Sequence, residues 1–220
     1  MASVAKYTAR QGAQILRHNE RTIQNPKNKD IDKNKTHLNY SLLDREEQGY
    51  KYFKKRKADP DLYCFRRSDV KEICGWIITK PKQLPPEHEQ RFFQESYNYL
   101  VKKFGGTNCE NVLSAIVHKD EATPHLHFLF IPVVADGKRG GEKISAKEKL
   151  SKAVLREVHP ELQEHLNRAG VPARVHSGIT AEQGGNRTVK ELKQDKPLKL
   201  NIRQTSREKG VFINREDDNR

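Results

Sequence analysis

The stretch from Ile116 to Phe130 constrains the fold of this 220-residue chain more than any other part of it. Residues 112–118 and 125–133 are rich in β-branched and apolar side chains and alternate as strands do. The segment between them carries turn residues such as Thr123 and Pro124. Two strands joined by so short a connection run antiparallel. The sequence therefore predicts a β-hairpin and, with it, an antiparallel sheet.

This hairpin brings three histidines and a glutamate to one end of its strands. His118 ends the first strand and His125 begins the second, so the two lie nearly opposite each other. His125 and His127 project from the same face, and Glu121 lies in the connection above them. Imidazole and carboxylate are the usual ligands of first-row divalent ions. A lone His-x-His pair is more often a chance pair on a half-polar strand, but the addition of His118 and Glu121 favours a metal site at a sheet edge.

A second histidine motif lies in the helix predicted for residues 11–24. His18 is flanked by Arg17 and Arg21, which are four residues apart and so neighbours on one helical face. This arrangement suits a phosphate group, since two cations hold the anion and the imidazole acts on it. Taken alone it is weak evidence, because most surface histidines have no such role.

The charge balance points to a polyanionic partner. Lysine and arginine number 42 against 29 aspartates and glutamates, a formal net charge of +13. Such an excess favours nucleic acid before a membrane. A solvated surface that only aids solubility is the plainer alternative, but the basic residues crowd into particular stretches instead of spreading evenly.

Localisation follows from what the sequence lacks. No window is apolar over the length needed to span a bilayer, and the N-terminus lacks the hydrophobic region of a signal peptide. The three cysteines are odd in number and show no Cys-x-x-Cys spacing, which indicates reduced thiols. We expect a cytoplasmic protein without a membrane-spanning segment.

The remaining pattern predicts an α+β fold, in which helices flank an antiparallel β-sheet. Further strands are expected at 3–9, 36–42, 73–79 and 171–176, and helices at 44–57, from Pro85 to Gly105, from Ser145 to Gly170 with a break or kink at Pro160, and at 187–193. The buried face of the helix that follows Pro85 is expected to comprise Phe92, Phe93, Ser96, Tyr97, Leu100, Val101 and Phe104. Residues 1–195 would form the catalytic domain, and 196–220 a polar tail or linker, perhaps leading to a further C-terminal region.

Most candidate DNA contacts lie outside the two histidine motifs. Tyr40, in the strand predicted for residues 36–42, either stacks on a base or is an ordinary tyrosine at the edge of the sheet. Arg66 and Arg67, which precede a predicted strand, and Lys138 and Arg139, in a glycine-rich loop, are also expected to contact DNA, and Arg17 of the helical histidine motif completes the set.

Together these motifs resemble those of a known family. Residues 17–21 (Arg-His-Asn-Glu-Arg), 28–32, 37–40 (His-Leu-Asn-Tyr), 76–79 and 118–127 occur in the same order in plasmid mobilization proteins. Over residues 1–195 the chain resembles the Mob/Pre relaxases of the MobV class. A departure is the Phe104-Gly105 pair, where relatives carry tyrosine and glycine.

The resemblance implies a fold, an activity and roles for named residues. It implies a variant of the histidine-hydrophobic-histidine (HUH) endonuclease fold and a metal-dependent enzyme that nicks and rejoins one strand at a plasmid origin of transfer. His18 would be the nucleophile, forming a covalent 5′-phosphohistidine adduct, with Glu20 and Arg21 as further catalytic residues. The implied metal ligands are His118, Glu121, His125 and His127. The partner would be origin-of-transfer DNA, with coupling or accessory proteins left open.

The chemistry of the residues agrees with this implication. Imidazole has a pKa near ~6.5, so a neutral histidine nucleophile is available at neutral pH, whereas tyrosine, with a pKa near ~10, must first lose a proton. A metal ion would act as a Lewis acid on the scissile phosphate. A ligand set of three histidines favours Mn²⁺ over Mg²⁺, which prefers oxygen ligands.

Three other functions stay open at this point. A rolling-circle replication initiator would use tyrosine as its nucleophile. A site-specific DNA-binding protein without catalysis would explain the positive charge but not the clustered ligands. A metal-dependent hydrolase would share the metal site but use water and form no covalent adduct.

Overall fold

The hairpin lies in the middle of a five-stranded antiparallel sheet, with strand order β1-β4-β6-β5-β2. These strands are β1 (Ala2–Tyr7), β2 (Tyr40–Ser41), β4 (Ile73–Thr79), β5 (Val112–His118) and β6 (His125–Phe130). The computed structural model describes residues 2–26 and 28–175, which fall within one compact unit, Met1–Ser177. The α+β class with an antiparallel sheet is confirmed.

The register of the hairpin is the expected one. His118 pairs with His125, and Ile116 pairs with His127. The cluster predicted for a sheet edge lies instead at the ends of two central strands, because β4 and β2 flank the hairpin on either side. Phe130 ends β6, so the second strand is shorter than predicted.

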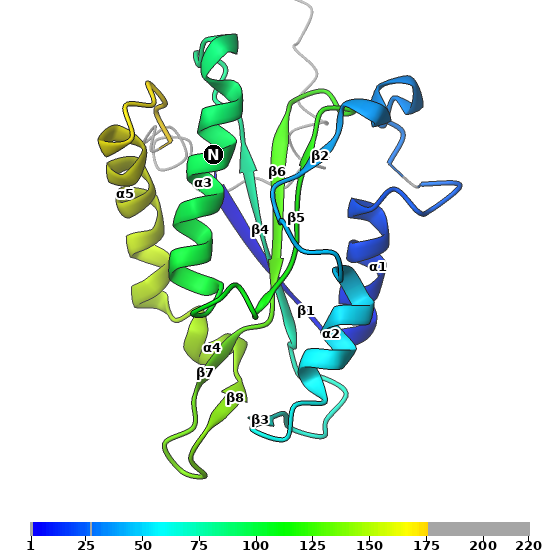
Figure 1. The fold of residues 1–220 in the computed structure, drawn as a ribbon, viewed down its shortest axis with the longest axis vertical. Coiled ribbons are helices and arrows are strands. Elements are labelled where there is room, and N and C mark those ends of the chain that lie inside the picture. Colours follow the sequence, from blue (N-terminus) through cyan, green and yellow to red (C-terminus); the bar gives the residue numbers. More distant parts are fainter. Residues whose placement is uncertain (1, 27, 176–220) are drawn as a thin grey trace, which may run out of the picture. The chain divides into compact units, whose positions relative to one another are not determined.

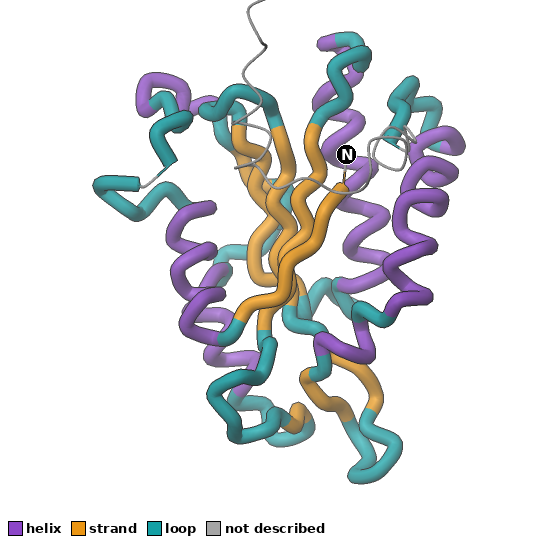
Figure 2. The backbone as a smooth tube through the Cα atoms, turned by 180° about the vertical axis from the view of Figure 1, so that it is seen from behind, coloured by secondary structure: helices purple, strands orange, loops and turns teal. Residues whose placement is uncertain are grey.

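Helices cover both faces of this sheet (Figures 1 and 2). One face carries α3 (Glu89–Phe104) and α5 (Lys152–Arg168), and the other carries α1 (Ala9–Asn19) and α2 (Gly49–Lys57). Alternation along the strands divides the core accordingly. Trp76, Phe128 and Phe130 pack with α3 and α5, whereas Leu113 and Leu129 pack with α1 and α2.

The odd-numbered residues of β6 therefore face α1, the helix that carries His18. Thr8 begins α1 with a capping box, in which its side chain accepts from the Gln11 amide and the Gln11 side chain accepts from the Thr8 amide. Gly12 lets α1 approach the sheet closely, since a Cβ there would lie 2.4 Å from Ile73 Cδ1. The face of α1 that packs on the sheet is formed by Gly12, Leu16 and Asn19, and His18 lies beside this face near the end of the helix.

A small second sheet adjoins the first. It is ordered β3-β8-β7, with β3 (Leu62–Tyr63) parallel to β8 (Glu142–Ile144) and β7 (Val133–Ala135) antiparallel to it. Neither β3 nor β8 was expected, because strands of two or three residues have too short an alternation of side chains to be recognised from sequence. This sheet lies at the end of the molecule away from the β5–β6 connection (Figure 1).

Several predicted boundaries were wrong. The helix expected at 11–24 ends at Asn19, since Arg21 adopts a left-handed backbone with φ +54°. Of the strand expected at 36–42 only Tyr40–Ser41 forms, because Lys33–Leu38 is the 3₁₀ helix η1. The helix expected from residue 44 begins at Gly49.

The C-terminal helices also differ from expectation. The break falls between α4 (Ala146–Lys149) and α5, where Ser151 caps α5, and α5 continues through Pro160. The buried positions Val158, Leu162 and Leu166 lie on both sides of the proline, so core packing offsets the lost hydrogen bond.

Of the remaining predictions, the start of the helix after Pro85 is confirmed, the strand at 171–176 does not form over its described residues, and the rest lie beyond the described residues. The 3₁₀ helix η2 (Pro86–His88) introduces α3, as the paired prolines predicted. Residues 171–175 form no strand, and the Gln163 side chain bonds to their backbone instead. His176, the helix expected at 187–193 and the tail at 196–220 lie outside the described residues.

Six of the seven predicted core positions of α3 are buried, and Val101 is partly buried. Among the described residues, no helix has both the length and the apolar character needed to cross a membrane.

Core packing should dominate the stability of the sheet. Phe128 is fully buried in the cluster beneath α3, with its ring centroid 6.2 Å from that of Tyr97. Phe128→Ala should lower the free energy of unfolding by about 3–5 kcal/mol, because it removes buried surface and leaves a cavity. Urea denaturation measures this change. Leu38→Ala, at a side chain that is 44% exposed, should change it by less than about 0.5 kcal/mol. Equal effects of the two substitutions would contradict this account of the core.

Candidate metal and catalytic site

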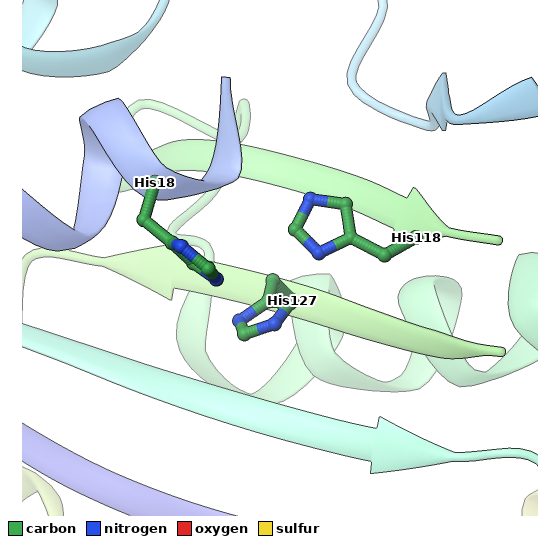
Figure 3. A group of neighbouring side chains, drawn as sticks. All are labelled: His18, His118 and His127. Atoms are coloured by element: carbon green, nitrogen blue, oxygen red, sulfur yellow. The ribbon is translucent and has the colours of Figure 1, made fainter. Parts of the chain in front are cut away.

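Four imidazoles gather where the end of α1 meets the hairpin. The ring centroids of His118 and His127 are 4.7 Å apart, and those of His125 and His127 are 4.8 Å apart. The ring of His18 approaches from α1, 6.0 Å from that of His118 and 6.1 Å from that of His127 (Figure 3). The two histidine motifs, separate in the sequence, therefore form one cluster.

Backbone carbonyls fix the orientation of two of these rings. His118 Nε2 lies 2.9 Å from the carbonyl oxygen of Asn19, and His125 Nδ1 lies 2.8 Å from that of Thr123. Because a carbonyl can only accept, these ring nitrogens are the ones that carry protons. The opposite nitrogens, His118 Nδ1 and His125 Nε2, hold the lone pairs. This is the arrangement in which histidines bind metal ions.

The remaining ring nitrogens converge on one region. His118 Nδ1 is buried and has no hydrogen bond in the described structure. His125 Nε2 and His127 Nε2 lie 3.0 Å apart. An unpartnered buried acceptor and two facing imidazole nitrogens are costly unless a proton or a cation lies between them. The donor set therefore fits a divalent metal ion.

The pKa values of the cluster favour the neutral, ligating form. Burial lowers the pKa of His118 to about 4. Burial and the neighbouring imidazoles lower the pKa of His127 well below its usual value. Neutral imidazole is the form that binds metal. These two rings are consequently ready to bind an ion at neutral pH.

Glu121 lies between the hairpin histidines and His18. Its Oε1 is 4.0 Å from His118 Nδ1 and 3.9 Å from His18 Nε2. Its oxygens also accept hydrogen bonds from Arg21 Nη2 at 2.9 Å and from Asn28 Nδ2 at 3.0 Å. The carboxylate can thus complete a ligand set with His118 and His125, or orient His18, without moving far.

The tautomer of His18 follows from its contact with Arg21. Arg21 Nη1 lies 3.2 Å from His18 Nε2 and 2.9 Å from the His18 carbonyl oxygen. Because a guanidinium only donates, Nε2 of His18 is the acceptor and holds the lone pair. Burial, followed by the charge of Arg21, lowers the pKa of His18. The unprotonated Nε2 of a neutral ring therefore faces the cluster.

Arg21 itself has a different environment from the one predicted. It was expected to be the partner of Arg17 on one helical face, but it lies beyond the end of α1 in the left-handed conformation. Its guanidinium makes two hydrogen bonds to Asp120, at 2.6 and 2.8 Å. Arg17 stays exposed on α1. The paired-arginine phosphate clamp is therefore wrong in its geometry.

Asp120 is the residue that sequence reasoning missed. Its carboxylate is fully buried and also accepts from Thr36 Oγ1 at 3.1 Å, and its carbonyl accepts from the Asp32 amide at 2.8 Å. The hydrogen bonds of Arg21 and other donors hold the pKa of this carboxyl far below its usual range, despite burial. A charged residue in a connection that contains turn residues gives no sequence signal that it will be buried.

Glu20 and Tyr40 lie in environments of their own, apart from the imidazoles. The Glu20 carboxylate lies against Gly49 of α2, where a Cβ would approach its Oε1 to 2.2 Å. Tyr40 is half-buried opposite Val117, and burial, then the charge of Glu89, raises its pKa to about 12. A tyrosine with so high a pKa is difficult to deprotonate.

The other predicted DNA contacts do not join the histidines. Arg66 and Arg67 follow β3, and Lys138 and Arg139 lie in the connection of β7 and β8, at the opposite end of the molecule (Figure 1). Arg139 stacks its guanidinium 4.0 Å from the centroid of the Tyr63 ring. These four residues form a separate basic region.

A cavity of about 300 Å³ opens beside His18. Its lining combines two cationic side chains with neutral polar and apolar ones: His18, Arg21, Ile23, Gln24, Pro26, Ile31, Lys33 and Thr36. A phosphate with an attached nucleoside would meet both kinds of surface there.

Comparison with known proteins places this site in context. A model of the plasmid recombination enzyme family (Mob_Pre) matches residues 1–194. The plasmid recombination enzyme type 1 of Staphylococcus aureus is 34% identical over 163 residues, which cover 71% of this chain and 38% of that protein. The plasmid recombination enzyme of Lactiplantibacillus plantarum is 30% identical over 202 residues, which cover 88% of this chain and 52% of that protein. The chain spans about half or less of the length of these relatives.

Solved structures give a corresponding match. The MobM relaxase domain, solved with Mn and with plasmid pMV158 oriT DNA, is 27% identical with a TM-score of 0.67. The match covers 88% of this chain and 97% of that domain. The same domain in a thiophosphate complex gives the same identity and TM-score.

The Asp120–Arg21 pair should hold the end of α1 against the hairpin. Asp120→Asn should lower the free energy of unfolding at pH 7 by about 2–3 kcal/mol, because it removes the charge that makes two of the hydrogen bonds to the Arg21 guanidinium and leaves Glu121 as its remaining charged partner. The folded-state pKa of Asp120 is depressed, so the pair contributes above the unfolded pKa near ~3.9 and its contribution falls as pH drops below that value. The difference between wild type and variant should therefore shrink at pH 3.

Urea denaturation at both pH values measures this difference. Asp69→Asn, in the exposed pair with Arg67, is the matched control and should cost less than about 1 kcal/mol. A pH-independent difference for Asp120→Asn would show that the charge of Asp120 is not what matters.

Proposed function

The chain belongs to the plasmid recombination enzyme family (Mob_Pre), and on this basis we propose that it is the catalytic part of a relaxase. It would nick one DNA strand at a plasmid origin of transfer and later rejoin it. The observation that carries the proposal is the unprotonated Nε2 of His18, which faces a cluster of three histidines that can bind a metal ion. The MobM relaxase domain, a structural relative, was solved with Mn and origin DNA.

The proposed metal ligands are His118 through Nδ1, His125 and His127 through Nε2, and Glu121 through a carboxylate oxygen. A bound divalent ion would supply Lewis acidity to the scissile phosphate and neutralise part of its charge. Imidazole ligands favour Mn²⁺ over Mg²⁺. The carbonyls of Asn19 and Thr123 hold two of the rings in the ligating tautomer.

His18 is the proposed nucleophile. Its Nε2 lone pair forms a bond to phosphorus as the bond from phosphorus to the 3′-oxygen breaks, and the electron pair of that bond leaves with the oxygen. The 3′-oxygen takes a proton from solvent. As the P–N bond forms, Nδ1 of the ring gives up its proton to solvent, so the product is a 5′-phosphoryl group on a neutral imidazole. Because the energy of the phosphodiester is kept in the P–N bond, the free 3′-hydroxyl can reverse the step.

Arg21 supports this reaction in two stages. Before attack its Nη1–H group bonds to His18 Nε2 and sets the tautomer. Once Nε2 bonds to phosphorus, that N–H is released and can donate to a phosphate oxygen, where negative charge develops. Asp120 and Glu121 hold the rest of the guanidinium in place throughout. We propose Arg21 as a catalytic residue on this ground, and we assign no step to Glu20.

The environment of Tyr40 argues against a tyrosine nucleophile of the replication-initiator kind, because its raised pKa disfavours the phenolate. Tyr40 lies on β2, and we propose a contact with DNA for it. A non-catalytic DNA-binding protein has no need of the metal cluster, and a water-using hydrolase would leave no covalent adduct.

Loss of the metal ligands should separate nicking from binding. His125→Ala and His127→Ala should each abolish Mn²⁺ binding in calorimetric titration and nicking of supercoiled origin DNA. Most of the DNA affinity should remain, because affinity depends on contacts between basic residues and phosphates. His165→Ala, on the surface of α5, is the matched control and should bind Mn²⁺ and nick normally. Full nicking by either ligand variant would overturn the metal assignment.

The covalent adduct should identify the nucleophile. Incubation with single-stranded origin DNA and Mn²⁺ should give a covalent complex that mild acid breaks, because protonation makes the imidazole of a phosphohistidine a good leaving group. His18→Ala should give no complex. Tyr40→Phe should still give one, with weaker binding or slower nicking. An acid-stable complex, or a nucleotide mapped to a tyrosine by mass spectrometry, would refute the assignment of His18.

A further inference from the structure

The connection that follows β3 carries an exposed aromatic side chain among cationic residues. Ile23, Leu38 and Phe65 are the exposed large hydrophobic side chains of the described residues, and only Phe65 is aromatic. Its side chain is 44% exposed. A single exposed apolar side chain is common on protein surfaces, so a binding role for this ring depends on what surrounds it.

Phe65 lines two adjacent cavities. The larger, of about 710 Å³, is lined by the cationic side chains of Lys57, Arg66 and Arg139, with the carboxylates of Asp61 and Glu142. The smaller, of about 330 Å³, is lined by Lys6, Arg67, Lys71 and Lys147, with the carboxylate of Asp69. Cations thus outnumber carboxylates on both sides of the ring.

Neighbouring groups hold this platform in place. The ring of Tyr63 meets that of Phe65 edge to face, with centroids 5.1 Å apart. The Arg139 guanidinium stacks on Tyr63 and pairs with Asp136 at 3.2 Å. The turn that carries Arg139 closes against β3 at Gly141, where a Cβ would meet the Asp61 carbonyl oxygen at 3.0 Å. Arg139 is therefore preorganised and still half-exposed.

We propose that Phe65 and the two cavities beside it form a binding site for single-stranded DNA, separate from the histidine cluster. An unpaired base stacks on the Phe65 ring, and the phosphates before and after it lie in the two cationic cavities. A single strand is the fitting ligand, because its base faces are open to an aromatic ring whereas those of a duplex are already stacked.

The site lies apart from the scissile phosphate. The central strands run between the histidines and the second sheet, and six steps of about 3.3 Å along β5 span roughly 20 Å. DNA held at Phe65 is therefore a different part of the strand from the nucleotides at His18. The inference rests on the proposed function only in taking DNA as the ligand.

Fluorescence offers a direct test of stacking. The single tryptophan of the chain, Trp76, is buried, so Phe65→Trp introduces the one exposed indole among the described residues. A single-stranded oligothymidylate of about 12 nucleotides, within the usual site size, should quench this indole on binding, with EDTA present to exclude nicking. Binding at saturation without quenching would overturn the proposal.

Affinity tests the same site independently. Phe65→Leu keeps an apolar side chain but removes the ring, and it should weaken oligothymidylate binding about 5-fold or more in fluorescence anisotropy. Arg66→Ala should also weaken binding. It should make the slope of log K against log salt shallower by the amount expected for about one phosphate contact. Arg168→Ala, at an exposed arginine of α5, is the control and should bind as wild type does. Wild-type affinity of Phe65→Leu, or equal losses for both arginine variants, would refute the site.

Neither experiment depends on nicking, so the two proposals can fail separately. A protein that forms no phosphohistidine adduct can still bind oligothymidylate at Phe65. Conversely, adduct formation at His18 with no response at Phe65 would retain the relaxase and reject this second site.

Discussion

The buried ion pair between Asp120 and Arg21 is the interaction on which the site depends. Two charged groups in a dry environment lose their hydration, and this loss is offset only when geometry and hydrogen bonding are both good. Here the carboxylate has two bonds from the guanidinium and another from Thr36. The pair joins the end of α1 to the hairpin connection, and Arg21 also contacts His18 and Glu121. One electrostatic contact thus orients the proposed nucleophile and one proposed ligand together.

How much of the site could be predicted from sequence depended on how far apart the interacting residues lie along the chain. The hairpin histidines lie within ten residues, so strand alternation and a short connection were enough to place them. Arg21 and Asp120 are 99 residues apart, and their contact requires α1 to end at Asn19. Helical spacing instead paired Arg21 with Arg17. The family resemblance, and not any pattern in residues 11–24, related His18 to the hairpin.

Composition indicated a basic protein but could not place its charge. Arg66, Arg67, Lys138 and Arg139 are distant from the histidines because β3 and β8 pair across about 80 residues to form the second sheet. Such short strands have no periodicity to detect. Pro160 shows the opposite case, in which a strong local signal was overruled by a helix whose buried face continues past it.

Gly12 has a consequence beyond close packing. It lies six residues before His18, about 9 Å along the axis of α1, and no side chain separates the helix from Ile73 of β4 at that point. The closeness of this contact sets the distance between the helix and the sheet. A side chain at position 12 would have to displace the Ile73 side chain or move α1, and with it the imidazole of His18, away from the sheet. The position of the proposed nucleophile therefore depends in part on a residue that has no side chain and no chemistry of its own.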